Sequence, residues 1–282
     1  MRTPADVAAA GQLACLLEAS APKPGNVFPG RRFHDIGYED FLASAVAIGP
    51  ALAEAGRVPI GVTVRTAIEA TRRWTRSNTN LGIVLLLAPL ARAALRPGGT
   101  LRDHVRAVLG ATTVADAAEV YAAIRLARPG GLGKEAREDV AGTPSVSLLE
   151  AMTLAAERDD VAREYATGYQ TTFEIGAPAL RAARAEGLSW TESTVEGYLR
   201  LLAARPDTHI TRKLGREAAD AVSRRAGEVV AAGGVRSEAG RRALATFDAE
   251  LRDEGNRRNP GTTADLSCAA LFVVILEGDW HP

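Results

Sequence analysis

Residues 147–187 decide the fold: SLLEAMTLAAERDDVAREYATGYQTTFEIGAPALRAARAEG. Apolar side chains recur there at helical steps, as at Leu148 and Met152 and again at Tyr165 and Tyr169. This spacing places them on one face of an α-helix. No segment of the sequence shows the sustained alternation of apolar and polar residues that a half-buried strand requires. The pattern therefore predicts an all-α protein.

Further helices are expected on both sides of this segment. Ser147 and Glu150 have the spacing of a capping box, which starts a helix. Gly25 and Gly187 stand where helices would stop. Similar amphipathic stretches cover residues 5–19, 38–55, 61–75, 82–96, 100–109, 113–127, 191–204, 211–232, 236–254 and 263–277. We predict a single-domain multi-helix bundle over residues 1–282, with polar loops at helix N-termini.

Charge and apolar content argue against two classes of partner. The 34 Lys and Arg residues balance the 34 Asp and Glu residues, so no general field draws the chain to nucleic acid or to an anionic membrane. The longest apolar run, residues 81–91, contains Pro89 and is too short to span a bilayer. Asp6, Gln12 and Glu18 interrupt the apolar core that a signal peptide would need. We expect a cytoplasmic protein.

The remaining composition points to close packing of helices. Cys15 and Cys268 lie in apolar helical surroundings and are predicted to be buried, reduced thiols. The four histidines and two cysteines show no zinc-ligand spacing. The tryptophans are predicted to anchor helix packing: Trp74, Trp190 and Trp280. Alanine-rich helical faces are compatible with a homodimer.

The first polar segment, SAPKPGNVFPGRRFHDIGYEDF, covers residues 20–41 and is long for a connection between helices. It combines cations with acids, and its prolines stiffen the backbone while its glycines allow a ligand to approach closely. This composition is typical of a phosphate clamp beside a metal-holding or proton-accepting carboxylate. The alternative is a solvated loop in which Asp35 caps the next helix and Glu39 complements its dipole.

Two more polar segments precede strongly apolar helices. SNTNLGIVLLLAPLA begins at residue 77, and RRNPGTTADLSCAALFVVIL begins at residue 257. A polar helix N-terminus followed by glycine offers N–H groups to an anion, so both ends could converge on one polyanionic ligand. Capping is the alternative in each segment, by Asn78 or Thr79 in the first and by a Thr262–Asp265 capping box in the second.

Two weaker signals remain. RPDTHITRKLG, residues 205–215, places Arg212 and Lys213 near a helix start. RPGGLGKEAREDV, residues 128–140, lacks the spacing of a Walker motif and is interpreted as a mobile flap. The charged residues of this flap are Lys134, Glu138 and Asp139.

Several segments, in this order, resemble the triphosphoribosyl-dephospho-coenzyme A synthase family: LLEASAPKPGNV, HDIGYEDFLASAVAI, SNTNLGIVLLLAPLA, DTHITRKLG and NPGTTADLSCAAL. The resemblance runs from Leu16 to Leu276. It implies an all-helical cytoplasmic enzyme that transfers the triphosphoribosyl group of ATP to the 2′-hydroxyl of 3′-dephospho-coenzyme A and releases adenine. The product would be a prosthetic-group precursor.

The chain departs from the family pattern at two points. Family members usually read T-N-T-H-K-G where this chain has Asn78 to Gly82, and they carry a lysine between the residues matching His34 and Asp35. This chain resembles a divergent branch, so its acceptor stays open between dephospho-coenzyme A and another cofactor precursor, such as a pterin or a phenolic compound.

The implied chemistry assigns roles to the polar residues. A triphosphate needs cations, helix N-termini and Mg²⁺, and breaking the bond between ribose and adenine needs a carboxylate near the sugar and a base for the acceptor hydroxyl. The predicted catalytic residues are Asp35, Glu39 and Asp265, with Asp35 and Asp265 also as metal ligands. The predicted nucleotide and phosphate ligands are Lys23, Gly25, Arg31, Asn78, Thr79, Asn80, Gly82, Arg212, Lys213, Asn259, Gly261, Thr262 and Thr263.

Two other functions stay open from the sequence. One is a Mg²⁺-dependent N-glycosidic hydrolase of ADP-ribosyl-hydrolase type, which normally shows adjacent aspartates in its metal loops. The one adjacent pair here, Asp159 and Asp160, falls inside a helical pattern. The other is a helical scaffold without catalytic activity, in which the cation clusters are solvated surface.

Overall fold

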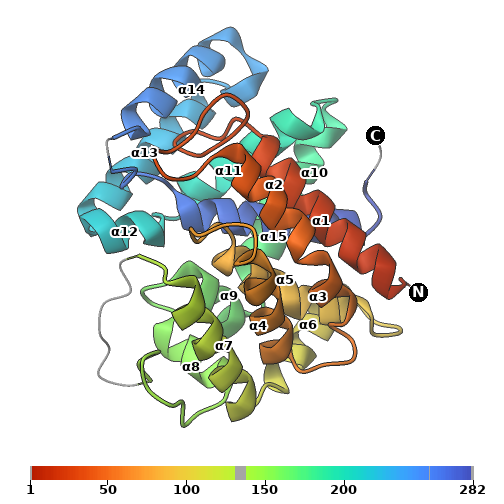
Figure 1. The fold of residues 1–282 in the computed structure, drawn as a ribbon. Coiled ribbons are helices and arrows are strands. Elements are labelled where there is room, and N and C mark those ends of the chain that lie inside the picture. The colour runs from red at the N-terminus through yellow and green to blue at the C-terminus, as the bar shows by residue number, and fades with distance from the viewer. Residues whose placement is uncertain (1, 131–137, 254, 281–282) are drawn as a thin grey trace.

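The protein is a bundle of helices in the computed structural model, which describes residues 2–130, 138–253 and 255–280 (Figure 1). These residues contain no strand beyond an isolated bridge between Phe28 and Arg31, so the all-α prediction is confirmed. The helices are α1 (Pro4–Ser20), α2 (Tyr38–Ala47), α3 (Gly49–Ala53), α4 (Ile60–Thr71), α5 (Leu81–Ala94), α6 (Leu101–Gly110), α7 (Val114–Ala127), α8 (Leu148–Ala155), α9 (Asp160–Thr167), α10 (Ala177–Ala185), α11 (Trp190–Ala204), α12 (Thr208–Leu214), α13 (Arg216–Ala231), α14 (Glu238–Leu251) and α15 (Gly261–Leu276). A π-helical turn at Thr172–Gly176 precedes α10, and a 3₁₀ turn at Gly234–Arg236 precedes α14.

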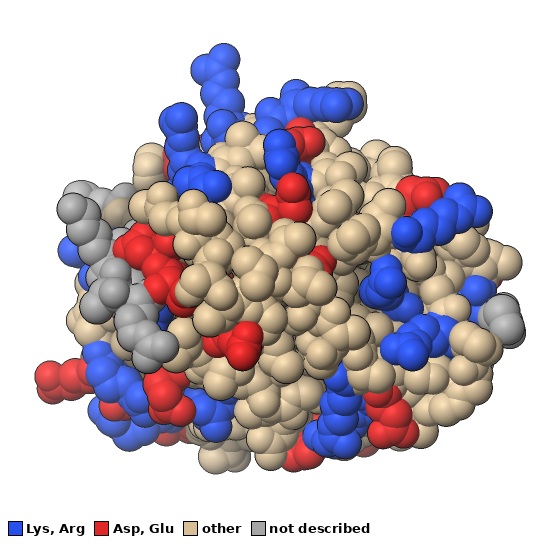
Figure 2. All heavy atoms as spheres, turned by 90° about the horizontal axis from the view of Figure 1, so that it is seen from below, with Lys and Arg blue, Asp and Glu red and all other residues tan. Residues whose placement is uncertain are grey.

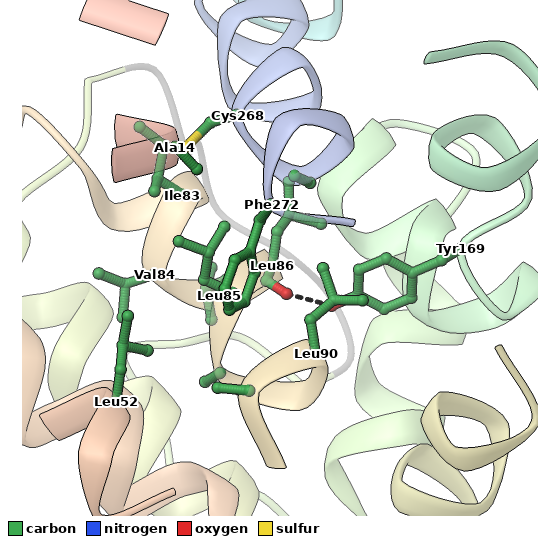
Figure 3. Close-up of a cluster of buried hydrophobic side chains, with 14 of the residues drawn as sticks. Ala14, Leu52, Ile83, Val84, Leu85, Leu86, Leu90, Tyr169, Cys268 and Phe272 are labelled. Carbon is green, nitrogen blue, oxygen red and sulfur yellow. Dashed lines mark hydrogen bonds between the residues drawn. The ribbon is translucent and has the colours of Figure 1, made fainter. Parts of the chain in front are cut away.

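Two apolar helices, α5 and α15, form the centre of the molecule. Every residue of α5 except Gly82 and Arg92 is buried, as are nearly all residues of α15. Helix α15 packs against α5 and α1, and α4 and α6 pack against α5 from other sides. Leu86, Leu90 and Phe272 lie together in this core (Figure 3). The N-termini of both helices are therefore held in fixed positions by extensive packing.

A proline inside α5 leaves a carbonyl for one of the two tyrosines that are buried beside it. Pro89 has no N–H and cannot bond to the carbonyl of Leu85 four residues earlier. The hydroxyl of Tyr165 donates to that carbonyl at 2.6 Å. The hydroxyl of Tyr169 donates to the carbonyl of Leu86 at 2.7 Å (Figure 3). These bonds tie α9 and the turn after it to α5.

A second cluster of buried side chains lies where α11, α12, α13 and α14 meet. It includes Tyr198, Leu199, Ile210, Val222 and Phe247. Figure 1 shows α13 and α14 at one end of the molecule and α7 and α8 at the other, with α15 between them.

Three predicted helices are broken in the structure. The predicted 38–55 helix divides at Gly49 because Pro50 cannot bond to the carbonyl of Val46, which accepts from Gln12 Nε2 at 3.0 Å instead. The predicted 211–232 helix divides at Gly215, whose φ of 88° is left-handed. The 147–187 segment divides into α8, α9 and α10, although its capping box at Ser147 is confirmed.

The surface mixes charges of both signs. Figure 2 shows Lys and Arg side chains interspersed with Asp and Glu around a largely uncharged centre of one face, in keeping with the zero net charge. Over the described residues, no single helix is long and apolar enough to cross a membrane. The pair α6 and α7 reaches that length and composition only together, and the two are bent by 96°.

Candidate active site

A cavity of about 350 Å³ lies where the N-termini of α5 and α15 meet α7, α8, α9 and α12. Its lining has a polar part, the polar end, and an apolar part, the apolar lobe. The polar lining includes Asn78, Asp159, His209, Arg212, Thr262 and Asp265. The apolar lobe includes Leu85, Val120, Ile124, Leu148, Met152 and Ala155.

Three helices of eight or more residues begin at the polar end. Leu81 is the first residue of α5, Thr262 the second of α15, and Asp159 the N-cap of α9, and all three line the cavity. Helix N-termini carry partial positive charge and favour anions. The polar end can therefore receive a negatively charged group.

Asp265 places a carboxylate in the cavity lining, and this carboxylate caps no helix. It is the fifth residue of α15, and that helix has no side-chain cap, so the capping-box interpretation of Thr262 and Asp265 is wrong. Burial, and then the negative charges of Glu18, Asp207 and Asp159, raise its pKa well above the ordinary aspartate value. Within the described residues, its carboxylate makes no direct hydrogen bond or ion pair.

Gly82 has a close contact with this carboxylate. A Cβ atom at position 82 would overlap Asp265 Oδ2, so the first turn of α5 and the side chain from α15 can lie together only with glycine there. This contact fixes the position of Asp265 relative to the N-terminus of α5.

Asp159 and Arg212 form a pair across the cavity lining. Asp159 Oδ1 accepts from the N–H groups of Val161 and Ala162 as the N-cap of α9, and its Oδ2 accepts from Arg212 Nη1 at 2.5 Å. The Arg212 Nε is buried and has no partner among the described residues. A guanidinium held by one carboxylate, with a second donor left over, is suited to an anionic ligand.

Asp207 and His209 build the wall from α12. Asp207 Oδ1 caps α12, and its Oδ2 accepts from Thr263 N at 2.7 Å and Thr263 Oγ1 at 2.8 Å, which joins α12 to the first turn of α15. Burial, helped by the charges of Lys213 and Arg212, lowers the pKa of His209 to about 3. His209 is therefore neutral at physiological pH.

Unsatisfied polar atoms concentrate at the predicted site. Of the buried side-chain N and O atoms without a partner in the described chain, three belong to predicted ligand residues: Asn80 Oδ1, Arg212 Nε and Asn259 Oδ1. Such atoms are rare in native proteins, and each one calls for an explanation. A ligand bound near these segments would supply the missing hydrogen-bond partners and so explain them.

The structure brings the NTN segment, α12 and the NPGTTAD segment together, as the sequence predicts. Five predicted residues line the cavity: Asn78, Gly82, Arg212, Thr262 and Asp265. Asn78 Oδ1 also accepts from Leu81 N at 3.1 Å and so satisfies the first N–H of α5, although the N-cap residue of this helix is Asn80.

Other predicted residues stand behind the lining. Thr79 is buried against Ser44, with 2.6 Å between their hydroxyl oxygens, and Asn80 Nδ2 donates to Thr71 Oγ1 at 3.0 Å. Gly261 packs next to the His209 ring. The N–H and the hydroxyl of Thr263 both donate to Asp207. The predicted ligand Asn259 has a buried Oδ1 without a partner in the described chain.

Lys23 is completely buried and has local partners. Its Nζ lies 2.9 Å from Glu18 Oε1 and donates to the carbonyls of Glu18 and Ala21 at the end of α1. Gly25 has a φ of 75°, and its N–H donates to Asp248 Oδ1 at 2.8 Å. Both residues therefore shape the loop that follows α1.

The acidic end of the first polar segment lies at the surface. Asp35, Glu39 and Arg31 are exposed and are not among the described residues that line the cavity. Helix α2 is capped through Gly37 and Asp40, so the interpretation of Asp35 as its cap is wrong. Lys213 is exposed, and its Nζ approaches the carbonyl of Asn256 at 3.5 Å.

Sequence reasoning missed several lining residues. Asp159, His209 and Arg158 line the cavity without having been assigned. The adjacent aspartates, Asp159 and Asp160, were the signal that could have identified Asp159. This residue is the N-cap of α9 and does not lie within a helix. The predicted flap at 128–140 includes residues 131–137, which lie outside the described residues, while Glu138 and Asp139 line the cavity.

A metal held by protein alone does not fit these residues. The described ranges contain no group of three or more His, Cys, Asp and Glu side chains placed to hold an ion. Of the predicted ligands Asp35 and Asp265, Asp265 alone lines the cavity.

Comparison with known proteins identifies a family, a curated relative and a solved structure that are similar to this chain. A family model described as ATP:dephospho-CoA triphosphoribosyl transferase matches residues 4–282. The 2-(5''-triphosphoribosyl)-3'-dephosphocoenzyme-A synthase of Klebsiella pneumoniae is 34% identical over 118 residues, which are 42% of this chain and 41% of that protein, so the match covers about two-fifths of this relative. The crystal structure of a candidate triphosphoribosyl-dephospho-CoA synthase from Archaeoglobus fulgidus superposes with a TM-score of 0.66 and 30% identity, over 84% of this chain and 99% of that one. The chain belongs to the ATP:dephospho-CoA triphosphoribosyl transferase family.

Proposed function

We propose that the protein transfers the triphosphoribosyl group of ATP to a hydroxyl of 3′-dephospho-CoA, or of a related cofactor precursor, with release of adenine. Membership of the family supports the substrate class. The observation that carries the proposal is the Asp265 carboxylate, which lines the cavity with a raised pKa and without a structural bond in the described chain. Perturbed carboxylates of this kind are typical of acid–base sites.

Asp265 acts as the general base in this proposal. The acceptor hydroxyl donates its hydrogen to the carboxylate, and its oxygen forms a bond to ribose C1′ while the bond from C1′ to adenine breaks. Adenine leaves with the bonding electrons and takes up one proton. A carboxylate with a raised pKa is a stronger base in its ionised form, which suits this transfer.

The triphosphate lies toward the helix N-termini and the free Nε donor of Arg212. Among the described residues, the cavity lining holds two arginines, Arg158 and Arg212, so charge neutralisation is shared with backbone N–H groups. Mg²⁺ commonly binds through one or two carboxylates and substrate phosphates, and would enter with ATP in that manner.

A hydrolase is the second candidate, because Asp159 lies at the start of α9 and faces the same cavity as Asp265. Water would then replace the acceptor. Incubation with ATP and Mg²⁺, with and without dephospho-CoA, separates the two functions when adenine is measured chromatographically. Transfer predicts release that depends on dephospho-CoA, and release at an equal rate without it would contradict the proposal.

A further inference from the structure

An exposed aromatic residue lies close to the cavity in sequence and in space. Trp74 is 70% exposed, which contradicts its predicted role in helix packing. Trp190 and Trp280 do pack, with ring centroids 4.6 Å apart. Trp74 is four residues from Asn78 of the cavity lining, so their Cα atoms lie within about 14 Å.

Three arginines flank this tryptophan in the segment TRRWTR, residues 71–76. Arg73 and Arg76 are exposed, and Arg72 is partly buried. None of the three forms an ion pair within the described residues, whereas nearby Arg65 is paired with both Glu69 and Glu119. The segment is therefore a local positive cluster on a chain without net charge.

The backbone of the segment is held in place. Trp74 N donates to the Thr71 carbonyl at 2.9 Å, and the Arg72 guanidinium donates to the carbonyl of Arg76. Thr75 is buried, and Asn80 Nδ2 donates back to Thr71 Oγ1 at 3.0 Å. The tryptophan is thus presented to solvent on an ordered turn that leads into the first residues of the site.

We propose that Trp74, Arg73 and Arg76 form an outer subsite for an adenine nucleotide. The base stacks on the indole and the phosphates pair with the guanidinium groups, both of which are established modes of nucleotide recognition. An interface with another protein would require a wider apolar patch, and Trp74 is the one aromatic among the exposed large apolar side chains of the described chain. The subsite rests on the proposed function in that its ligand is a substrate of the cavity, either ATP or the adenine end of a dephospho-CoA acceptor.

Tryptophan fluorescence tests the subsite directly, because Trp74 is the exposed member of the three tryptophans. The intact protein is titrated separately with ATP, dephospho-CoA, adenosine and inorganic triphosphate. We expect quenching by one or both adenine nucleotides and none by inorganic triphosphate, and the nucleotide that quenches identifies the source. Trp74→Ala should remove the quenching and weaken binding of that nucleotide about 5- to 150-fold by calorimetry.

Two matched variants check the phosphate contacts. Arg73→Gln and Arg76→Gln should each weaken the same nucleotide, whereas Arg96→Gln, an exposed arginine beyond the end of α5, should not. Nucleotide binding with unchanged Trp74 emission, or a fluorescence change on dilution alone, would overturn the subsite. Adenine release with unchanged Trp74 emission would overturn the subsite but not the transferase. Quenching of Trp74 without adenine release would overturn the transferase but not the subsite.

Discussion

Replacing Asp265 by asparagine separates a catalytic carboxylate from a structural one. The side chain keeps its shape but loses its negative charge and its ability to accept a proton. Because Asp265 caps no helix and accepts no direct bond from the described residues, the cost of about 1 kcal/mol for losing a cap does not apply. We expect turnover to fall by about 10²- to 10⁴-fold, the range for loss of general-base catalysis.

The effect on stability has a definite sign. The folded-state pKa of Asp265 is raised, so the ionised form is disfavoured in the folded protein, and the carboxyl group lowers stability progressively as the pH rises from the ordinary aspartate pKa to the raised one. Asp265→Asn should therefore melt at the same temperature as wild type or higher at neutral pH. The difference should vanish below the ordinary aspartate pKa of about 4. Wild-type activity should in turn fall on acidification through the raised pKa.

Asp116→Asn is the matched control. Asp116 is buried outside the cavity lining, and its carboxylate accepts from Gly61 N at 2.9 Å, Thr113 N at 2.9 Å and Thr113 Oγ1 at 2.8 Å. The amide cannot accept all three bonds, so stability should fall by about 1–3 kcal/mol, or roughly 2–4 °C in melting temperature per kcal/mol, with turnover retained. Calorimetric melting and adenine release measured on both variants test the reasoning. A destabilised but fully active Asp265→Asn enzyme would refute it.

Two further changes follow from contacts in the core. Gly82→Ala should displace the Asp265 carboxylate and lower turnover about a hundredfold, and an alanine variant with wild-type kinetics would show that the contact is unimportant. Tyr165→Phe should leave the Leu85 carbonyl without a partner beside Pro89 and lower the free energy of unfolding by about 1–3 kcal/mol, measured by urea denaturation, with little effect on KM. Unchanged stability would mean that another group satisfies that carbonyl.

The helical architecture could be predicted because period and capping are local properties. The capping box at Ser147 and the buried apolar helix after Asn80 are both present in the structure. The helix breaks were less accessible. Pro50 lies in the first turn of α3, where proline is tolerated, and the carbonyl of Val46 accepts from Gln12, a residue distant in sequence. Breaks of this kind depend on which side chain the fold brings to an orphaned carbonyl.

The site was predictable as a meeting of segments but not in the role of each side chain. Lys23 looks like a phosphate ligand until its pairing with Glu18 and the end of α1 is known. The tasks of Asp159 and Asp265 depended on where each helix begins, to within a few residues, which sequence patterns do not define well. The exposure of Trp74 is likewise a tertiary property.

The central claim is that this cavity transfers a triphosphoribosyl group instead of hydrolysing ATP to adenine. The most direct test is mass spectrometry of the products formed from dephospho-CoA and ATP labelled with ¹³C in the ribose, with wild-type protein and with Asp265→Asn. The account predicts that the labelled ribose appears in a dephospho-CoA adduct, in equal amount to free adenine, and that both are lost in the variant. Label in free ribose triphosphate with no adduct, or an undiminished adduct with Asp265→Asn, would contradict it.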